Sequence, residues 1–145
     1  MMKILLAVSA LALTVSTSFA DPLADRKALM KSLGGGLGAM APIARGEQPY
    51  DADKVATALA SLSETAGKLD VAALFPAGSG TGDTDALPAI WDNVADFTAH
   101  MDKLKADIAE VAASVPADQA GVGAALGKLG ANCGSCHEVY RAKKG

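Results

Sequence analysis

Aromatic and cysteine residues are scarce in this sequence. Only 4% of the 145 residues are aromatic, with 1 Trp, 2 Tyr and 3 Phe. The 2 cysteines cannot form a framework of several disulfide bonds, and a bond between such close neighbours would constrain too short a loop to stabilise the chain appreciably. We therefore expect the cysteines to serve chemistry rather than to hold the fold together.

The sequence also lacks a strong excess of either charge. It has 13 Lys and Arg residues against 16 Asp and Glu residues, for a formal net charge of −3, and no dense basic stripe. A surface that neutralises phosphates needs such a stripe, so nucleic acid is not an expected partner. A length of 145 residues suits a single domain and excludes a large multidomain enzyme.

The N-terminal segment is predicted to be a secretory signal peptide. Lys3 is followed by an apolar run from Ile4 to Val15, which is too short to span about 30 Å of hydrocarbon. Small residues precede a cleavage site after Ala20. We predict a periplasmic protein in which residues 1–20 are removed and residues 21–145 form a domain without a membrane anchor. The alternative is that the apolar run remains as an anchor.

The rest of the chain shows the periodicity of amphipathic helices. Apolar residues recur at alternating spacings of three and four, which places them on one helical face. The most regular stripe predicts one continuous helix that starts at Asp85 or Pro88 and stops at Pro116. Its apolar residues are Ile90, Val94, Phe97, Met101, Leu104, Ile108, Val111 and Val115. Another helix is predicted from an N-cap at Asp51, along Val55, Leu59, Leu62, Ala66 and Leu69.

Two further stripes predict the first and last helices. The first helix is expected to end at Gly46 and to kink at Pro42, and its stripe is Met30, Leu33, Leu37, Met40 and Ala44. The last helix carries both cysteines on its stripe, which is Val122, Leu126, Leu129, Cys133, Cys136 and Tyr140. A long loop rich in Gly, Ser and Thr runs from Pro76 to Thr84. Because no strand pattern or internal repeat is present, the sequence predicts an all-α bundle of four helices.

Glycine is frequent in the first and last helices of this prediction. The glycines are Gly34, Gly35, Gly36, Gly38, Gly121, Gly123, Gly127, Gly130 and Gly134. Each glycine inside a helix costs about 1 kcal/mol relative to alanine. Together with the missing aromatic volume, they suggest that the bundle leaves space for a bound planar ligand. Close helix–helix packing or fraying of the helix ends is the alternative explanation.

The segment Cys133-Gly134-Ser135-Cys136-His137 has the C-x-x-C-H pattern of covalent haem attachment. In such a site two thiols add to the vinyl groups of the haem and the adjacent imidazole binds iron. A redox disulfide of the thioredoxin type normally follows a strand, and none is expected here. A structural zinc ion needs further Cys or His ligands, and only His100 remains. The sequence therefore predicts one covalently bound haem c on Cys133 and Cys136, with His137 as an axial ligand.

A C-x-x-C-H pattern near the C-terminus of an exported all-α domain resembles the cytochrome c′ family, the class II c-type cytochromes. The segments that carry the resemblance are Arg26 to Met30, Gly46 to Ala52, Leu74 to Pro76, Pro88 to Trp91 and Cys133 to Arg141. The resemblance implies an antiparallel up-down-up-down four-helix bundle with one haem near its end, often as a homodimer.

The resemblance also implies that the residue on the far side of the iron comes from the first helix. Aligning the segment from Gly46 to Tyr50 places Met30 at that position. Some family members have an apolar residue there and a five-coordinate iron open to NO or CO, whereas others have methionine bonded to the iron. We interpret Met30 as the second axial ligand. The alternatives are that Met30 is a space-filling core residue, or that Met40, about 15 Å further along the helix axis, is the ligand.

Several other residues are candidates for the haem pocket. Arg26 lies four residues before Met30 and Arg141 four residues after His137, so each is one turn from a proposed ligand and could reach a haem propionate. Ordinary surface solvation is the alternative for both arginines. The candidate apolar walls are Phe75, Trp91 and Tyr140, each of which could instead be a core residue. His100 lies off the apolar stripe and is expected to be exposed.

These residues lead to a functional prediction. With His137 and Met30 both on iron, no coordination position stays open, so the protein is expected to be a low-spin electron carrier that meets other redox proteins weakly and transiently. The alternative is a five-coordinate protein that binds NO or CO, with His137 as its only axial ligand. A haem enzyme such as a peroxidase would need an acid–base residue over an open haem face, and His100 is poorly placed for that role.

Overall fold

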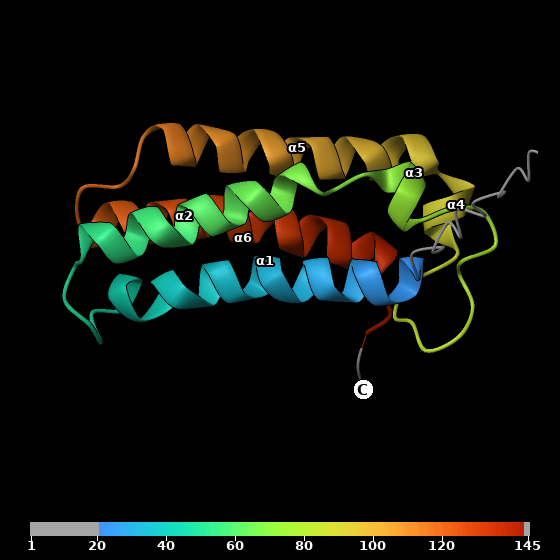
Figure 1. Ribbon diagram of the computed structural model, residues 1–145, viewed down its shortest axis with the longest axis horizontal. Coiled ribbons are helices and arrows are strands. Elements are labelled where there is room, and N and C mark those ends of the chain that lie inside the picture. The colour runs from blue at the N-terminus through green and yellow to red at the C-terminus, as the bar shows by residue number, and fades with distance from the viewer. Residues whose placement is uncertain (1–20, 144–145) are drawn as a thin grey trace, which may run out of the picture.

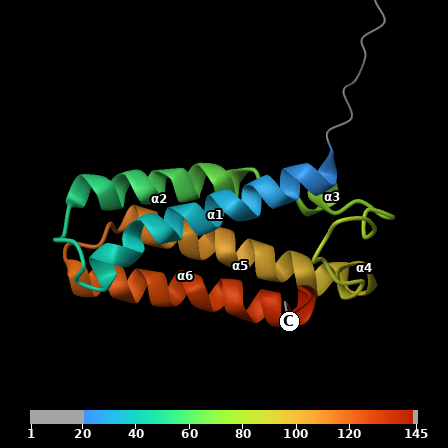
Figure 2. The same cartoon turned by 90° about the horizontal axis from the view of Figure 1, so that it is seen from below.

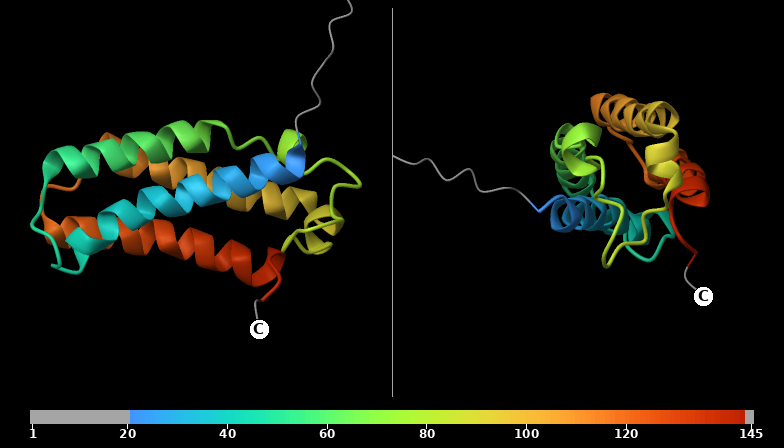
Figure 3. Two further views of the ribbon diagram at one scale, coloured as in Figure 1. Left: turned by 60° about the horizontal axis from the view of Figure 1, so that its bottom comes forward. Right: turned by 90° about the vertical axis from the view of Figure 1, so that its right-hand side faces the viewer.

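The computed structural model of this chain describes residues 21–143, so the predicted signal peptide at residues 1–20 lies outside the described residues. The helices are α1 (Pro22–Ala44), α2 (Ala52–Gly67), α3 (Val71–Leu74), α4 (Ala89–Asp92), α5 (Val94–Ala113) and α6 (Gln119–Tyr140). The long helices α1, α2, α5 and α6 lie side by side and alternate in direction (Figures 1 and 2). The end-on view in Figure 3 places α1 beside α2 and α6 and diagonally across from α5. The predicted all-α antiparallel four-helix bundle is confirmed.

Aspartate side chains begin three of the long helices. The carboxylates of Asp21, Asp51 and Asp118 each accept a hydrogen bond from a backbone N–H in the first turn of α1, α2 and α6, respectively. Such caps satisfy donors that have no partner inside the helix. The predicted N-cap at Asp51 is therefore confirmed. After α1, the chain turns at Gly46 with a φ of +72°, a conformation that glycine adopts without strain.

The prediction of one continuous helix from Asp85 or Pro88 to Pro116 is wrong. Asn93 leaves the helical conformation, with φ −139° and ψ 63°, and its side chain caps the start of α5 by accepting from the Asp96 N–H. The break turns Val94 out of the apolar stripe, so this residue is 47% exposed. At the other end α5 stops at Ala113, and Val115 beyond it is 42% exposed. The apolar periodicity shows which residues would share a helical face, but it does not show that asparagine favours the position just before a helix begins.

The long loop is fastened to the end of α6. Leu87 N–H donates to the Tyr140 carbonyl at 3.0 Å, and Ala142 N–H donates to the Asp85 carbonyl at 2.8 Å. Between these bonds Ala86 and Arg141 form an isolated antiparallel bridge. The short helix α3, which the sequence analysis did not predict, begins before the loop at an Asp70 cap. The loop therefore closes one end of the bundle beside the last turns of α6.

The core consists of apolar side chains from all four long helices. Its most deeply buried members are Phe97, Met40, Ile43, Leu59, Leu62, Ile108, Leu129, Val55 and Val122. These lie on the predicted stripes, except that Ile43 was not predicted. Among the described residues, no helix is long and apolar enough to cross a membrane.

Candidate functional site

A cavity of about 510 Å³ opens between α1, α5 and α6, at the end of the bundle that the long loop closes. Its volume lies in the range of ligand-binding pockets, roughly 300–1,000 Å³. Eight of the nine predicted site residues line it: Arg26, Met30, Phe75, Cys133, Cys136, His137, Tyr140 and Arg141. Trp91 does not. The structure thus brings together residues from both ends of the sequence in one place.

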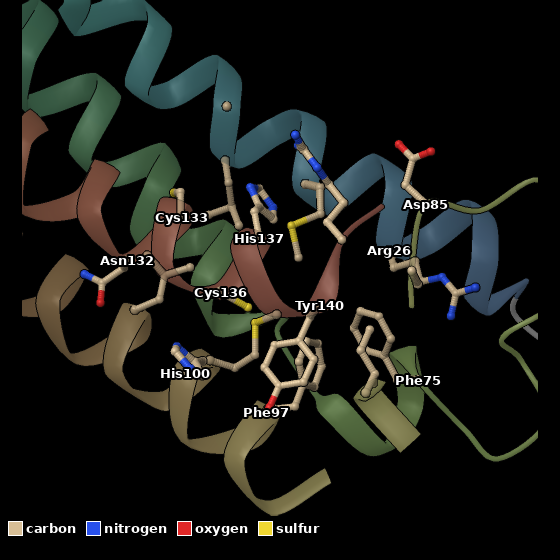
Figure 4. Close-up of a pocket in the computed structure, with 18 of the residues that line it drawn as sticks. Arg26, Phe75, Asp85, Phe97, His100, Asn132, Cys133, Cys136, His137 and Tyr140 are labelled. Carbon is tan, nitrogen blue, oxygen red and sulfur yellow. The ribbon is translucent and has the colours of Figure 1, made fainter. Parts of the chain in front are cut away.

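The attachment segment lies within α6, whose segment from Asn132 to Tyr140 lines the cavity. Because Cys136 and His137 lie three and four residues after Cys133, the helix presents them on adjoining parts of one face. Cys136 is buried and Cys133 is half-buried, and both thiols are free. Figure 4 shows His137 on the side of α6 that faces α1, and Cys136 on the side that faces α5.

Burial controls the protonation of these three groups. Burial raises the pKa of Cys133. Burial also raises the pKa of Cys136 to about 11, with smaller contributions from the neighbouring Cys133 and Asp96. A redox-active dithiol needs the opposite shift, so the geometry does not favour thioredoxin-like chemistry. Burial, and secondarily the charge of Arg141, lowers the pKa of His137. The imidazole is therefore neutral at neutral pH and has a nitrogen lone pair to offer a metal ion.

Aromatic rings form one wall of the cavity. Phe75 and Phe97 pack edge to face with centroids 4.7 Å apart, and Phe97 and Tyr140 do so at 5.1 Å. The Tyr140 hydroxyl donates to Asp96 Oδ2 at 2.5 Å, and this bond, together with burial, raises the pKa of Tyr140 to about 12. Three of the five aromatic residues in the described part of the chain thus gather at this site. Phe97 was predicted only as a core residue.

His100 also belongs to this wall, so the expectation that it is exposed was wrong. Its side chain is 26% exposed, lines the cavity and packs edge to face on Tyr140 with centroids 5.8 Å apart. Its Nε2 lies 3.6 Å from Asp96 Oδ2. The position beside the apolar stripe pointed to the surface, but α6 packs against that side of α5 and covers it.

Arg26 is buried, with an exposed fraction of 4%. Its guanidinium donates to the carbonyl of Ser79 at 2.6 Å, to the Ser79 hydroxyl at 3.2 Å and to the Thr84 hydroxyl at 3.4 Å. It also lies over the ring of Phe75 at 5.2 Å. Arg26 therefore holds the long loop against the cavity, a role that no local sequence signal could reveal. Arg141, in contrast, is exposed at the cavity margin.

Trp91 lies behind the cavity wall rather than in it. Its indole N–H donates to the carbonyls of Phe75 and Pro76 at 3.1 and 3.0 Å. Its ring is 6.4 Å from that of Phe75. Trp91 thus supports Phe75 from outside, because the turn of α4 directs it toward the loop.

The cavity contains two methionines, Met30 of α1 and Met101 of α5. Met40, the alternative ligand considered from the sequence, is fully buried in the core and does not line the cavity. Met101 is 4% exposed and was predicted only as a core residue. The apolar stripe of α5 already contains Met101. Knowing in addition that α5 packs against α6 would have identified Met101 as a cavity residue.

Two glycines of α1 have different surroundings. A Cβ atom on Gly36 would lie 2.7 Å from two carbons of Leu62, so this glycine permits close packing of α1 on α2. Gly34 lines the cavity, and a Cβ atom there would meet nothing within 4 Å. Gly36 therefore fits the close-packing interpretation, and Gly34 is the one glycine of the nine that lines the cavity. With the thiols, the neutral imidazole and the aromatic wall, the open side at Gly34 fits a large planar group such as haem.

The chain is similar to known proteins over nearly all of its described residues. A family model described as Cytochrome C′ matches residues 21–141. A cytochrome c-556 of Agrobacterium tumefaciens is 50% identical over 119 residues, which cover 82% of this chain and 95% of that protein. The structure of cytochrome c′ from Rhodopseudomonas palustris is 38% identical, with a TM-score of 0.78, and covers 87% of this chain and 99% of its own. A variant of cytochrome c prime from Alcaligenes xylosoxidans, solved as its nitric oxide complex, is 30% identical with a TM-score of 0.74 and covers 88% of this chain and 98% of its own.

Proposed function

The chain belongs to the cytochrome c′ family, whose members bind one covalently attached haem c and are electron carriers or gas binders rather than enzymes. On this premise we propose that it is a periplasmic electron carrier. In this proposal Cys133 and Cys136 hold the haem, and His137 and Met30 are the two axial ligands of its iron. The observation that carries the proposal is that all four side chains line one cavity, from helices that pack against each other.

The haem would supply an iron that gains and loses one electron. The chain supplies ligands suited to it, since the pKa of His137 is lowered and a thioether is a soft ligand that favours ferrous iron. With both axial positions occupied, no substrate could reach the iron. That arrangement favours electron transfer over gas binding.

The other cavity residues support the same role by excluding water and supplying charge. Phe75, Phe97 and Tyr140 give an apolar wall, which favours the reduced state because reduction removes positive charge from a site of low dielectric constant. Arg26 and Arg141 line the cavity and are proposed to pair with the haem propionates. Redox partners would dock transiently at the cavity margin.

Gas binding is the second candidate function. It is favoured by the similarity to the Alcaligenes xylosoxidans protein, a variant of which binds nitric oxide. In that case His137 alone would bind the iron and Met30 would be a neighbouring side chain. The two functions differ only in the contact that Met30 makes.

Substitution of Met30 tests this distinction. We expect Met30→Ala to abolish the methionine-to-iron charge-transfer band of the ferric protein and to let the ferrous protein bind carbon monoxide. Met101→Leu is the matched control, because Met101 lines the same cavity from α5 and should leave both properties unchanged. Identical spectra of Met30→Ala and the unmodified protein would contradict the assignment of Met30.

Export is part of the proposal, with cleavage after Ala20. The mass of the protein purified from a bacterial periplasm gives its first residue and the number of attached haems together. A chain that begins at Asp21 and carries one haem is expected.

A further inference from the structure

Two polar contacts, one buried and one partly buried, join α5 to α6 on either side of the segment from Cys133 to His137. Before the segment, Asn132 Nδ2 donates to Asp107 Oδ2 at 2.7 Å. After it, the Tyr140 hydroxyl donates to Asp96 Oδ2 at 2.5 Å. Asn132 is 8% exposed and Tyr140 is 4% exposed. The attachment segment is therefore enclosed between two links to the same neighbouring helix.

The spacing of the two acceptors matches the helical repeat. Asp96 and Asp107 are about three turns apart on α5, so they lie on one face and about 16 Å apart along the axis. A single contact between two helices leaves one free to rotate about it. Two contacts separated along the axis oppose both rotation and sliding.

Asp107 is a strong acceptor in this position. Its side chain is 11% exposed and also contacts Lys103 at 2.5 Å and Lys128 at 3.3 Å. Hydrogen bonds from Lys103 and Asn132 lower the pKa of Asp107 to about 2, so the carboxylate stays charged at neutral pH. Hydrogen bonds to an ionised acceptor are shorter and stronger than neutral ones, and leaving such a group buried without a donor is costly.

The packed face of α6 carries few apolar side chains near the attachment segment. Between Ala125 and Tyr140, only Leu129 and Cys136 are buried apolar residues. Gly127, Gly130 and Gly134 are exposed and lie on the solvent side of the helix. The polar links at Asn132 and Tyr140 add a directional restraint to this packing.

We propose that Asn132 and Asp107 are positioning residues for haem attachment and ligation. They set the rotation and axial position of α6 against α5, with Tyr140 and Asp96 as the second anchor, and so fix where the His137 imidazole stands in the cavity. This inference rests on the proposed attachment at Cys133 and Cys136. It does not depend on whether Met30 binds the iron.

The test uses Asn132→Leu, Tyr140→Phe and the double substitution in the holoprotein. Tyr140→Phe keeps the ring that packs on Phe97 and removes only the hydroxyl, so it is expected to fold. Electron paramagnetic resonance of the ferric protein reports the environment of the histidine-bound iron in either coordination state. We expect one species in the unmodified protein, a split or shifted signal in each single variant, and a larger change in the double variant, at unchanged helical circular dichroism.

The exchanged pair Asp107→Asn/Asn132→Asp is the rescue variant, because it keeps a carboxylate–amide hydrogen bond with the charge moved to α6. It should restore the single species that Asn132→Leu loses. Glu110→Gln is the matched control, since the Glu110–Lys128 pair also joins α5 to α6 but the Glu110 side chain is exposed, and exposed pairs contribute little. Signals unchanged in all three test variants would overturn the proposal. A high-spin signal in the unmodified protein would instead count against Met30 ligation, and the comparison between variants would still hold.

Discussion

At the residue scale, burial and hydrogen bonding act in opposite directions on the pKa of Asp107. Its pKa is lowered from 3.8 to about 2, chiefly by hydrogen bonds from Lys103 and Asn132, while burial acts in the opposite direction. A carboxyl group whose pKa is lower in the folded protein stabilises the fold above its unfolded pKa. That contribution is lost as the pH falls through the folded pKa.

This sign leads to a prediction for acid stability. Between about pH 4 and about pH 2, the free energy of unfolding of the unmodified protein should fall more steeply than that of Asp107→Asn, as measured by denaturant titration at each pH. Glu64→Gln is the comparison, because Glu64 forms only an exposed pair with Lys68, and such pairs contribute little. Parallel curves for the unmodified protein and Asp107→Asn would show that ionisation of Asp107 does not stabilise the fold.

At the same scale, the sequence predicts the proposed attachment residues but not their surroundings. Cys133, Cys136 and His137 follow a short pattern with a fixed chemical meaning, so local sequence is sufficient to propose them. The partners of Arg26 at Ser79 and Thr84 are more than fifty residues away in the chain, and no local pattern links them. The environment of His100 was misjudged for the same reason, since it is set by the neighbouring helix.

At the scale of helices, glycine has opposite effects at two positions of α1. A Cβ atom at Gly36 would collide with Leu62, which is 1% exposed and has no room to move. At Gly38 a Cβ atom would meet nothing within 4 Å. The same substitution should therefore destabilise the fold at one site and stabilise it at the other.

We expect Gly38→Ala to raise the free energy of unfolding by about 1 kcal/mol, because alanine has the higher helix propensity. Gly36→Ala should lower it by about 1–3 kcal/mol, the usual cost of overpacking a core. Chemical denaturation of the two holoproteins measures both changes against the unmodified protein. If both variants were stabilised, α1 and α2 would not pack as closely as the structure shows.

Helix boundaries were predictable where a cap and an apolar stripe agreed, as at Asp51. They were not predictable where the two signals conflicted, as at Asn93, where the stripe runs on but the asparagine side chain begins a new helix. Periodicity reports which residues would share a face if the helix were continuous. It does not report whether a cap interrupts it.

At the scale of the whole molecule, the bundle places side chains that are distant in sequence around one cavity. Met30 comes from the first helix, Met101 and His100 from α5, and the attachment segment from α6. The alternation of helix direction sets these residues at the same height, because the start of α1 and the end of α6 lie at the same end of the bundle (Figure 1). The fold class was predictable from periodicity, whereas the full cavity lining required the packing order of the helices.

In the proposed site, His137 and Met30 together bind the iron of a haem attached at Cys133 and Cys136. The most direct measurement is the optical spectrum of the unmodified ferrous protein before and after exposure to carbon monoxide. We expect sharp low-spin α and β bands that do not change on exposure, because neither axial position is free. Rapid conversion to the spectrum of a carbon monoxide complex would contradict the claim and favour gas binding.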